Sequence, residues 1–208
     1  MLYSLIILLN IFSLLLLVFY VKLKSNNNLL HLVILFSFGA LYELIFTIYF
    51  KVNSEIWFKI YPFLEFIGLL YFFRKLIGLS QSVFYIIIGI YSVLFIYMYY
   101  LYHFKISSTA LELFIPITHC LLVFTGSTKW TIQQFEKLET SSLLHFPVFY
   151  ILSGMILYYS GTFFIFGLET IFRYTKSPVL LYYWYINLLL LFIYRLSFYI
   201  AIWKAKKV

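Results

Sequence analysis

Three glutamates, Glu43, Glu65 and Glu112, lie inside long apolar runs of the sequence. A charged side chain at the centre of a membrane helix costs about 2.5–3.5 kcal/mol on insertion scales, unless it faces protein or water. The three carboxylates are therefore expected to face the interior of a helical bundle, as an acidic pocket for a cation, a proton relay or a polar ligand. The alternative is structural: carboxyl groups that are protonated or hydrogen-bonded to tyrosine and threonine would hold the helices together.

The three glutamates share a predicted depth in the membrane. Each lies six to eight residues from a lysine in a loop, which corresponds to roughly 9–12 Å along a helix. The three loops fall on one predicted side, so the carboxylates are expected to form a single layer in the outer half of the bilayer. Asn187, nine residues after Pro178, falls at about the same depth.

Arg195 is a basic residue inside the last apolar run, and it shares a helix face with Asn187 at a spacing of eight residues. An arginine in a membrane segment needs a partner or water, and no acid is expected at its depth. One prediction is that it reaches toward the glutamate layer as a counter-charge that gates a path or binds an anion. The other is that its stem extends to the cytoplasmic interface.

His119 is expected near the middle of the membrane, next to Cys120. Adjacent residues point in different directions from a helix, so this pair does not predict a metal site. His119 remains a candidate member of the site for a ligand, proton or cation, and its simpler interpretation is a hydrogen-bonded core histidine. No cofactor is predicted.

Seven apolar runs of about twenty residues are each long enough to span a bilayer. The chain is 64% hydrophobic and 24% aromatic, with a mean hydropathy of +0.99, and it has no polar stretch that would hold a soluble domain. We therefore predict an all-α polytopic membrane protein with a single transmembrane domain, residues 1–208. The predicted spans are approximately 1–20, 29–50, 56–73, 82–102, 108–128, 143–172 and 178–203.

The basic residues predict the orientation of the chain. With seven spans, nine lysines and arginines fall on the side of the C-terminus and five on the other side. Cytoplasmic loops carry the excess of positive charge, which predicts the N-terminus outside and the C-terminus inside in a multi-pass protein of the inner (plasma) membrane. The first run has no basic leader segment and is predicted to be a retained helix. The net charge of +8 is assigned to topology and lipid head groups, so no nucleic acid is expected.

Small residues lie close to the intramembrane charges. Gly39 is one helical turn from the first glutamate, and Gly68 follows the second by three residues. The sixth run carries Ser153-Gly154 and Ser160-Gly161, which are two turns apart. Small residues allow helices to approach closely, so these faces are predicted to pack against other helices. Among the prolines, Pro62, Pro147 and Pro178 are expected near helix starts and Pro116 inside a helix.

Several kinds of catalysis lack the residues that they need. The chain has no aspartate and only four scattered histidines, which argues against membrane hydrolases with a zinc site and against enzymes that use paired aspartates. It also lacks a Gly-x-Ser-x-Gly motif and a glycine-rich nucleotide-binding motif. The last run carries Arg195 where retinal proteins need a lysine for a Schiff base. A non-enzymatic protein is therefore favoured.

A broader pattern joins the segment from Pro147 to Tyr150, the segment from Ser153 to Gly161, and the glutamates Glu43 and Glu65 in earlier helices. This pattern resembles a group of small seven-helix bacterial membrane proteins that have no assigned activity. Some members of that group accompany sensory signalling components. The resemblance covers most of the chain and implies no particular site residue.

Three functions are compatible with these features, and an enzyme that acts on lipid is the third and least favoured. The first is a sensing or partner-binding membrane module that detects a small ligand or the state of the envelope through the acidic layer and acts on a membrane or cytoplasmic protein partner. A partner is required because the loops are too short to transmit a signal alone. The second is a small transporter or channel, with Glu43, Glu65 and Glu112 as a cation or proton site and Arg195 opposing them. The oligomeric state is left open.

Overall fold

The computed structural model describes residues 2–23, 29–45, 55–104, 110–136, 143–175 and 180–205, and these segments are helical almost throughout. The all-α prediction is confirmed for this part of the chain, in which no strand occurs. The helices are α1 (Leu2–Leu23), α2 (Leu30–Tyr42), α3 (Glu55–Ile77), α4 (Gln81–His103), α5 (Ala110–Glu136), α6 (Pro147–Thr175) and α7 (Leu180–Ala205), with a short 3₁₀ helix at Leu143–His145.

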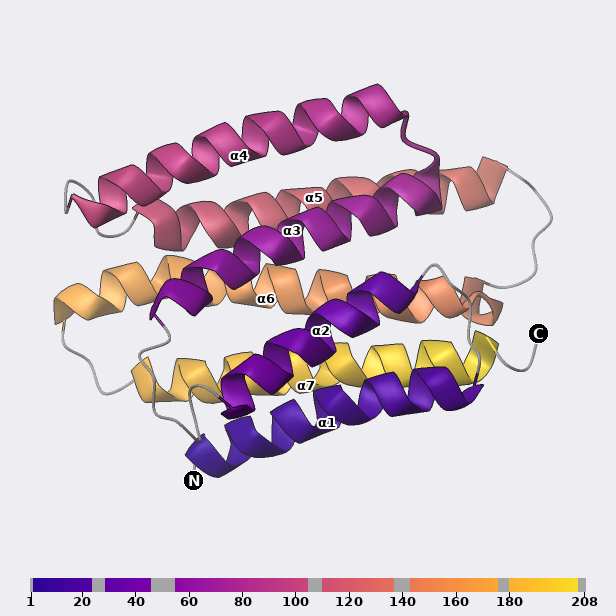
Figure 1. Ribbon diagram of the computed structural model, residues 1–208, viewed down its shortest axis with the longest axis horizontal. Coiled ribbons are helices and arrows are strands. Elements are labelled where there is room, and N and C mark those ends of the chain that lie inside the picture. The colour runs from indigo at the N-terminus through magenta and orange to yellow at the C-terminus, as the bar shows by residue number, and fades with distance from the viewer. Residues whose placement is uncertain are drawn as a thin grey trace.

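The seven helices lie side by side along the long axis and alternate in direction (Figure 1). Each helix packs against the next one in the sequence, and α7 closes the ring by packing against α1. α3 also packs against α5, which leaves α4 at the periphery. Inward-facing side chains of α2, α3, α5, α6 and α7 therefore meet in one interior.

Five of the helices, α1, α4, α5, α6 and α7, are long and apolar enough to cross a membrane. α2 is apolar but has 13 residues, which corresponds to roughly 20 Å and is shorter than the hydrocarbon core. α3 has 23 residues but carries Glu65, Arg74 and Lys75 within its apolar stretch. The helices thus indicate a membrane protein, while the number of spans and the orientation remain predictions.

Several predicted helix ends differ from the structure. α3 ends at Ile77 rather than at 73, and α6 begins at Pro147 rather than at 143. α5 continues to Glu136, eight residues beyond the predicted end at 128, because its polar last turns are amphipathic rather than a loop. Trp130 in this extension is only 4% exposed, and the Gln133 side chain donates a hydrogen bond to the Ile77 carbonyl at 3.3 Å. α2 ends at Tyr42 and is followed by a single wider turn, residues 43–45, and the rest of the predicted helix lies outside the described residues.

The prolines agree with their predictions in part. Pro147 is the first residue of α6, where a missing N–H group costs little. Pro116 lies inside α5, as predicted. Pro62 was expected near a helix start, but it lies inside α3, seven residues after Glu55. Pro178 is outside the described residues.

The turn between α3 and α4 shows why a glycine is required there. Gly78 has a φ of +69°, a conformation that other residues adopt at a cost. The N–H of Leu79 donates to the Arg74 carbonyl at 3.1 Å. This hydrogen bond and the positive φ of Gly78 are two features of a Schellman cap, which ends α3. The Ser80 side chain then accepts from the Val83 N–H at 3.4 Å and starts α4.

α2 and α3 pack through the glycines that were predicted to face another helix. A Cβ atom at Gly39 would collide with the ring of Tyr61, and one at Gly68 would contact Leu35 at 2.8 Å. Each glycine therefore receives a large side chain from the opposite helix. The predicted packing role of these two glycines is confirmed.

α6 and α7 form the most extensive helix pair, and glycines again allow the close approach. A Cβ atom at Gly154 would collide with the Ser197 side chain, and one at Gly161 would collide with Leu190. The two contacts lie seven residues apart on α6, so the helices stay close over at least two turns.

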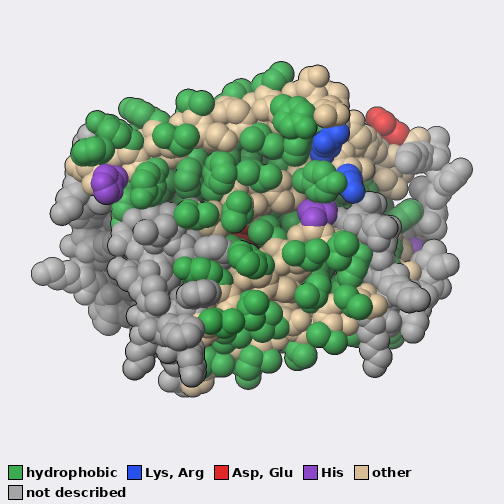
Figure 2. All heavy atoms as spheres, in the orientation of Figure 1, with side chains coloured by type: hydrophobic (Ala, Val, Ile, Leu, Met, Phe, Trp, Pro, Cys, Tyr) green, Lys and Arg blue, Asp and Glu red, His purple; other side chains and the backbone are tan. Residues whose placement is uncertain are grey.

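Buried side chains of three helices gather toward one end of the bundle. In α7 they lie between Tyr194 and Ile202, and in α6 between Ile151 and Thr162; in the described part of α3 they begin at Phe66. We call this end, where α3 and α7 finish and α6 begins, the basic end; its described cations are Arg74, Lys75, Lys129 and Lys204. Figure 2 shows a largely hydrophobic face whose lysine and arginine side chains lie toward one end.

Candidate functional site

A group of polar side chains lies in the interior, where α3, α5, α6 and α7 meet. We call it the central cluster. Its members share direct contacts or short-range electrostatic interactions, and they are Tyr61, Glu65, His119, Tyr158, Tyr159, Tyr194 and Arg195. Three predicted site residues, Glu65, His119 and Arg195, thus belong to one group.

Glu65 is held by a tyrosine of α6. The Tyr159 hydroxyl donates to Oε1 of Glu65 at 2.8 Å and links α6 to α3. Tyr159 is only 3% exposed, whereas Glu65 is half-buried. This hydrogen bond fixes the carboxyl group of Glu65 against α6.

His119 is fully enclosed between α3 and α6. Its Nδ1 lies 2.8 Å from the Ile115 carbonyl, and its Nε2 lies 3.2 Å from the Pro62 carbonyl of α3. A neutral imidazole donates to one of these carbonyls, and only the protonated ring donates to both. The ring also stacks on Tyr159 with centroids 5.6 Å apart. The prediction of a hydrogen-bonded core histidine is confirmed, and the contact places His119 beside the partner of Glu65.

Arg195 is buried, with 6% of its surface exposed. Its guanidinium carbon lies 3.6 Å from the centroid of the Phe36 ring, so one face of the group rests on α2. Its Nε and Nη1 atoms are buried and have no hydrogen-bond partner among the described residues. Tyr61 and Glu65 both interact with Arg195 electrostatically. It therefore faces the cluster, and it does not extend to the interface.

Tyrosines surround the two charged side chains. Tyr194 and Tyr158 stack with ring centroids 5.1 Å apart, and Tyr194 contacts Tyr159 edge to face at 5.8 Å. The guanidinium of Arg195 is also within hydrogen-bonding reach of Tyr61. These four rings connect the carboxylate on α3 to the guanidinium on α7.

The other predicted site residues lie in separate groups. The Asn10 side chain donates to Oε2 of Glu43 at 3.0 Å, which joins α1 to α2. Asn187 accepts a long hydrogen bond from Thr162 at 3.4 Å, which joins α7 to α6. Glu112 lies in the first turn of α5, about 10 Å along the helix from His119. The structure therefore does not gather the three glutamates into one acidic pocket.

Sequence reasoning missed the residues that connect the charges. Tyr61, Tyr158, Tyr159 and Tyr194 were not predicted as site residues, because the chain has 21 tyrosines and most positions suit a membrane interface. One sequence feature does point to Tyr61: it lies one turn before Glu65 on the same helix face. Phe36 gives no such indication, since its partner lies far away in the chain.

The chemistry of the central cluster follows from its composition. It contains one carboxylate, one guanidinium and one imidazole, and the described residues hold no group of three or more metal-ligating side chains. A transition metal or a zinc-dependent reaction has no ligand set in this part of the chain. The arrangement suits the binding of charge, the transfer of a proton, or a response to either.

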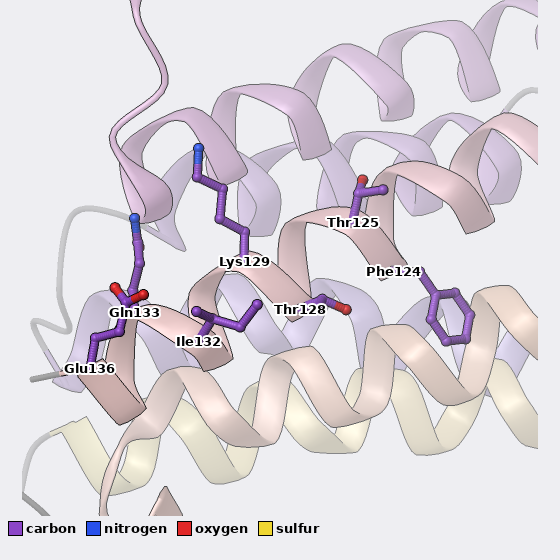
Figure 3. Close-up of a pocket in the computed structure, with 7 residues that line it drawn as sticks. All are labelled: Phe124, Thr125, Thr128, Lys129, Ile132, Gln133 and Glu136. Carbon is purple, nitrogen blue, oxygen red and sulfur yellow. The ribbon is translucent and has the colours of Figure 1, made fainter. Parts of the chain in front are cut away.

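A second feature is a shallow groove of about 520 Å³ along the outer side of α5 (Figure 3). It begins beyond His119 and follows the helix toward the basic end. Its lining residues are Phe124, Thr125, Thr128, Lys129, Ile132, Gln133 and Glu136. The groove contains none of the central cluster, and its charged lining residues are Lys129 and Glu136.

No protein-family model matches the chain, and neither a curated protein nor a solved structure gives a significant match. The resemblance to small seven-helix bacterial membrane proteins therefore gains no family assignment. What the protein does has to be argued from the central cluster itself.

Proposed function

We propose that the protein is a non-enzymatic integral membrane module that binds a small polar ligand at the central cluster and passes this state to a protein partner. The observation that carries the proposal is the meeting of half-buried Glu65 and buried Arg195 in one interior, where tyrosines contact both and two guanidinium nitrogens have no hydrogen-bond partner among the described residues. Intramembrane charges of this kind are functional by default.

A purely structural role accounts poorly for Arg195. A buried arginine costs about 2.5–3.5 kcal/mol at the centre of a membrane helix. The Phe36 ring at 3.6 Å offsets part of this cost, with cation–π contacts contributing about 0.5–2 kcal/mol. Two guanidinium nitrogens still lack an acceptor among the described residues. A leucine at this position would pack α7 more simply.

The cluster is also placed to change the packing of several helices. Glu65 belongs to α3, Tyr159 to α6 and Arg195 to α7, so a change in the charge balance acts on three helices at once. A ligand shifts a conformational equilibrium when it binds one state more tightly than the other. Such a change at the cluster would move the ends of these helices, where a partner can contact them.

The distribution of buried side chains supports access from the end opposite the basic end. The described side chains of α7 that precede Tyr194 are half-buried or exposed, and so are those of α3 that precede Phe66. We place this end outside the cell and the basic end in the cytoplasm, as the loop charges predict. The partner would then dock at the basic end.

The experiment is purification of the full chain from native membranes in mild detergent, followed by mass spectrometry of the intact complex. We expect a stoichiometric protein partner whose retention changes in Glu65→Gln. Tyr97→Phe serves as a control, because Tyr97 is 54% exposed on the peripheral helix α4 and lies in the half of that helix away from the basic end. If no partner is retained by the unaltered protein under conditions that keep it folded, the sensing proposal is wrong.

A second candidate function is transport of a proton or a small ion. The observation that favours it is the proximity of three groups that can carry a proton: Glu65 is hydrogen-bonded to Tyr159, and the Tyr159 ring stacks on His119. Reconstitution into proteoliposomes tests it through a flux that Glu65→Gln abolishes and Glu136→Gln leaves unchanged. An equal flux in both variants would exclude the central carboxylate from the transport mechanism.

A further inference from the structure

The central cluster carries one negative and one positive side chain, and this balance restricts the ligands that it can accept. A simple anion near Arg195 is also near the carboxylate of Glu65, and a simple cation near Glu65 is also near the guanidinium. In an interior of low dielectric constant these repulsions are strong. A ligand with a single charge is therefore disfavoured at either residue.

The hydrogen-bonding capacity of Arg195 points to a ligand with acceptor oxygens. The side chain is only 6% exposed, so its Nε and Nη1 atoms are shielded from solvent. Within the described structure these two atoms also have no hydrogen-bond partner. Because one face of the guanidinium rests on the Phe36 ring, its N–H groups point outward from the edges of the plane. Carboxylate is the group whose geometry and charge best match such donors.

Glu65 offers the complementary half of the site. Its Oε1 accepts from Tyr159, and the side chain is half-buried, whereas Arg195 is fully enclosed. An ammonium group of a ligand would balance the charge of this carboxylate and donate hydrogen bonds to its oxygens. The tyrosine rings of α6 and α7 beside the two charges provide apolar surface and can make cation–π contact with an ammonium group.

From these observations we infer that the ligand of the central cluster is a small zwitterion of the amino-acid type, with its carboxylate toward Arg195 and its ammonium group toward Glu65. This inference rests on the proposed function, because it names the ligand class of the same site. It predicts that both charges of the ligand are needed together and that neither half binds well alone.

The test uses the full chain in lipid nanodiscs. It measures the shift in melting temperature with each ligand and the dissociation constant by isothermal titration calorimetry. The twenty common L-amino acids are screened first, and the strongest binder is compared with its N-acetyl form, which lacks the ammonium group, and its amide, which lacks the carboxylate. We expect the zwitterion to bind at least about tenfold more tightly than either derivative. Equal binding of the N-acetyl form, or no binding by any amino acid, overturns the inference.

Reciprocal variants sharpen the test. Glu65→Gln should weaken the zwitterion and allow the N-acetyl form to bind, since the repelling carboxylate has gone. Arg195→Gln should have the opposite preference and accept the amide. The control Glu136→Gln should behave like the unaltered protein. If Glu65→Gln and the unaltered protein have the same ligand preference, the charge argument is wrong; if a variant does not fold, the comparison of the three ligands on the unaltered protein still decides.

The outcome can be separated from that of the proposed function. A stoichiometric partner whose retention depends on Glu65, together with no binding of any amino acid, would remove the ligand class and leave the sensing role in place. Binding of a zwitterion without any partner would support the inference and remove the sensing role, with transport as the remaining function.

Discussion

Replacing Tyr159 by phenylalanine removes one hydroxyl from the central cluster and leaves the ring. The hydroxyl donates to Oε1 of Glu65 at 2.8 Å in a position that is 3% exposed. The ring contacts to His119 and Tyr194 are kept by phenylalanine. Any change in stability therefore reports on the hydrogen bond between α6 and α3.

The expected magnitude follows from the charge of the acceptor. Side-chain hydrogen bonds between membrane helices average about 0.6 kcal/mol and reach about 1.7 kcal/mol. Bonds to ionised groups in soluble proteins contribute about 1.5–3 kcal/mol. A buried tyrosine that donates to the Glu65 carboxylate belongs at the upper end of the membrane range. We expect Tyr159→Phe to lower the free energy of unfolding by about 1.5 kcal/mol, which is roughly twelvefold in the equilibrium constant.

The assay is reversible unfolding by SDS in mixed micelles, followed by tryptophan fluorescence. Tyr97→Phe is the matched control, because Tyr97 is 54% exposed on the peripheral helix α4. The double variant with Glu65→Gln measures the coupling directly, and we expect an interaction energy of about 1 kcal/mol. A loss for Tyr159→Phe no larger than that of the control, or a coupling energy near zero, would refute the assignment of this contact.

Three further predictions concern contacts between helices, and SDS unfolding measures all of them. Gly154→Ala should destabilise the protein by about 1–3 kcal/mol, because the new methyl group meets α7. Its control, Gly89→Ala, places the methyl group in open space and should be neutral or slightly stabilising. Equal effects of the two variants would contradict the close crossing of α6 and α7. Asn10→Ala should cost about 1 kcal/mol through loss of its bond to a carboxylate of α2, and an unchanged midpoint would show that this bond does not stabilise the pair. Phe36→Leu should cost about 1 kcal/mol more than Phe72→Leu, since only the first ring supports a guanidinium; an equal cost would exclude the cation–π contribution.

The helical fold was predictable because hydrocarbon thickness fixes the length of an apolar run. The seven runs correspond to the seven helices, and Pro147 begins α6 as expected. The end of α5 was not predictable from hydropathy, since the residues after Thr128 are polar on one face and pack through Trp130 on another. Composition alone does not separate such an amphipathic extension from a loop.

The candidate site was predictable only for its charged members. Glu65, His119 and Arg195 are conspicuous because polar side chains are costly in apolar runs. Their tyrosine partners look the same as the many tyrosines that face lipid or the interface. Which of them is buried depends on how the helices are rotated about their axes, and the low contrast between inner and outer faces in a membrane protein hides this rotation.

The position of the cluster within the bundle bears on how a signal could travel. Arg195 lies at the start of the buried segment of α7, and Glu65 immediately precedes the buried segment of α3. From there to the basic end, the three helices are held by close-packed side chains such as Phe72, Phe198 and Met155. A well-packed segment moves as a unit, because its side chains interlock in few arrangements. A ligand that pulls Glu65 and Arg195 together would therefore act on these rigid segments at their ends farthest from the basic end. Because the segments are rigid, their opposite ends would move at the basic end.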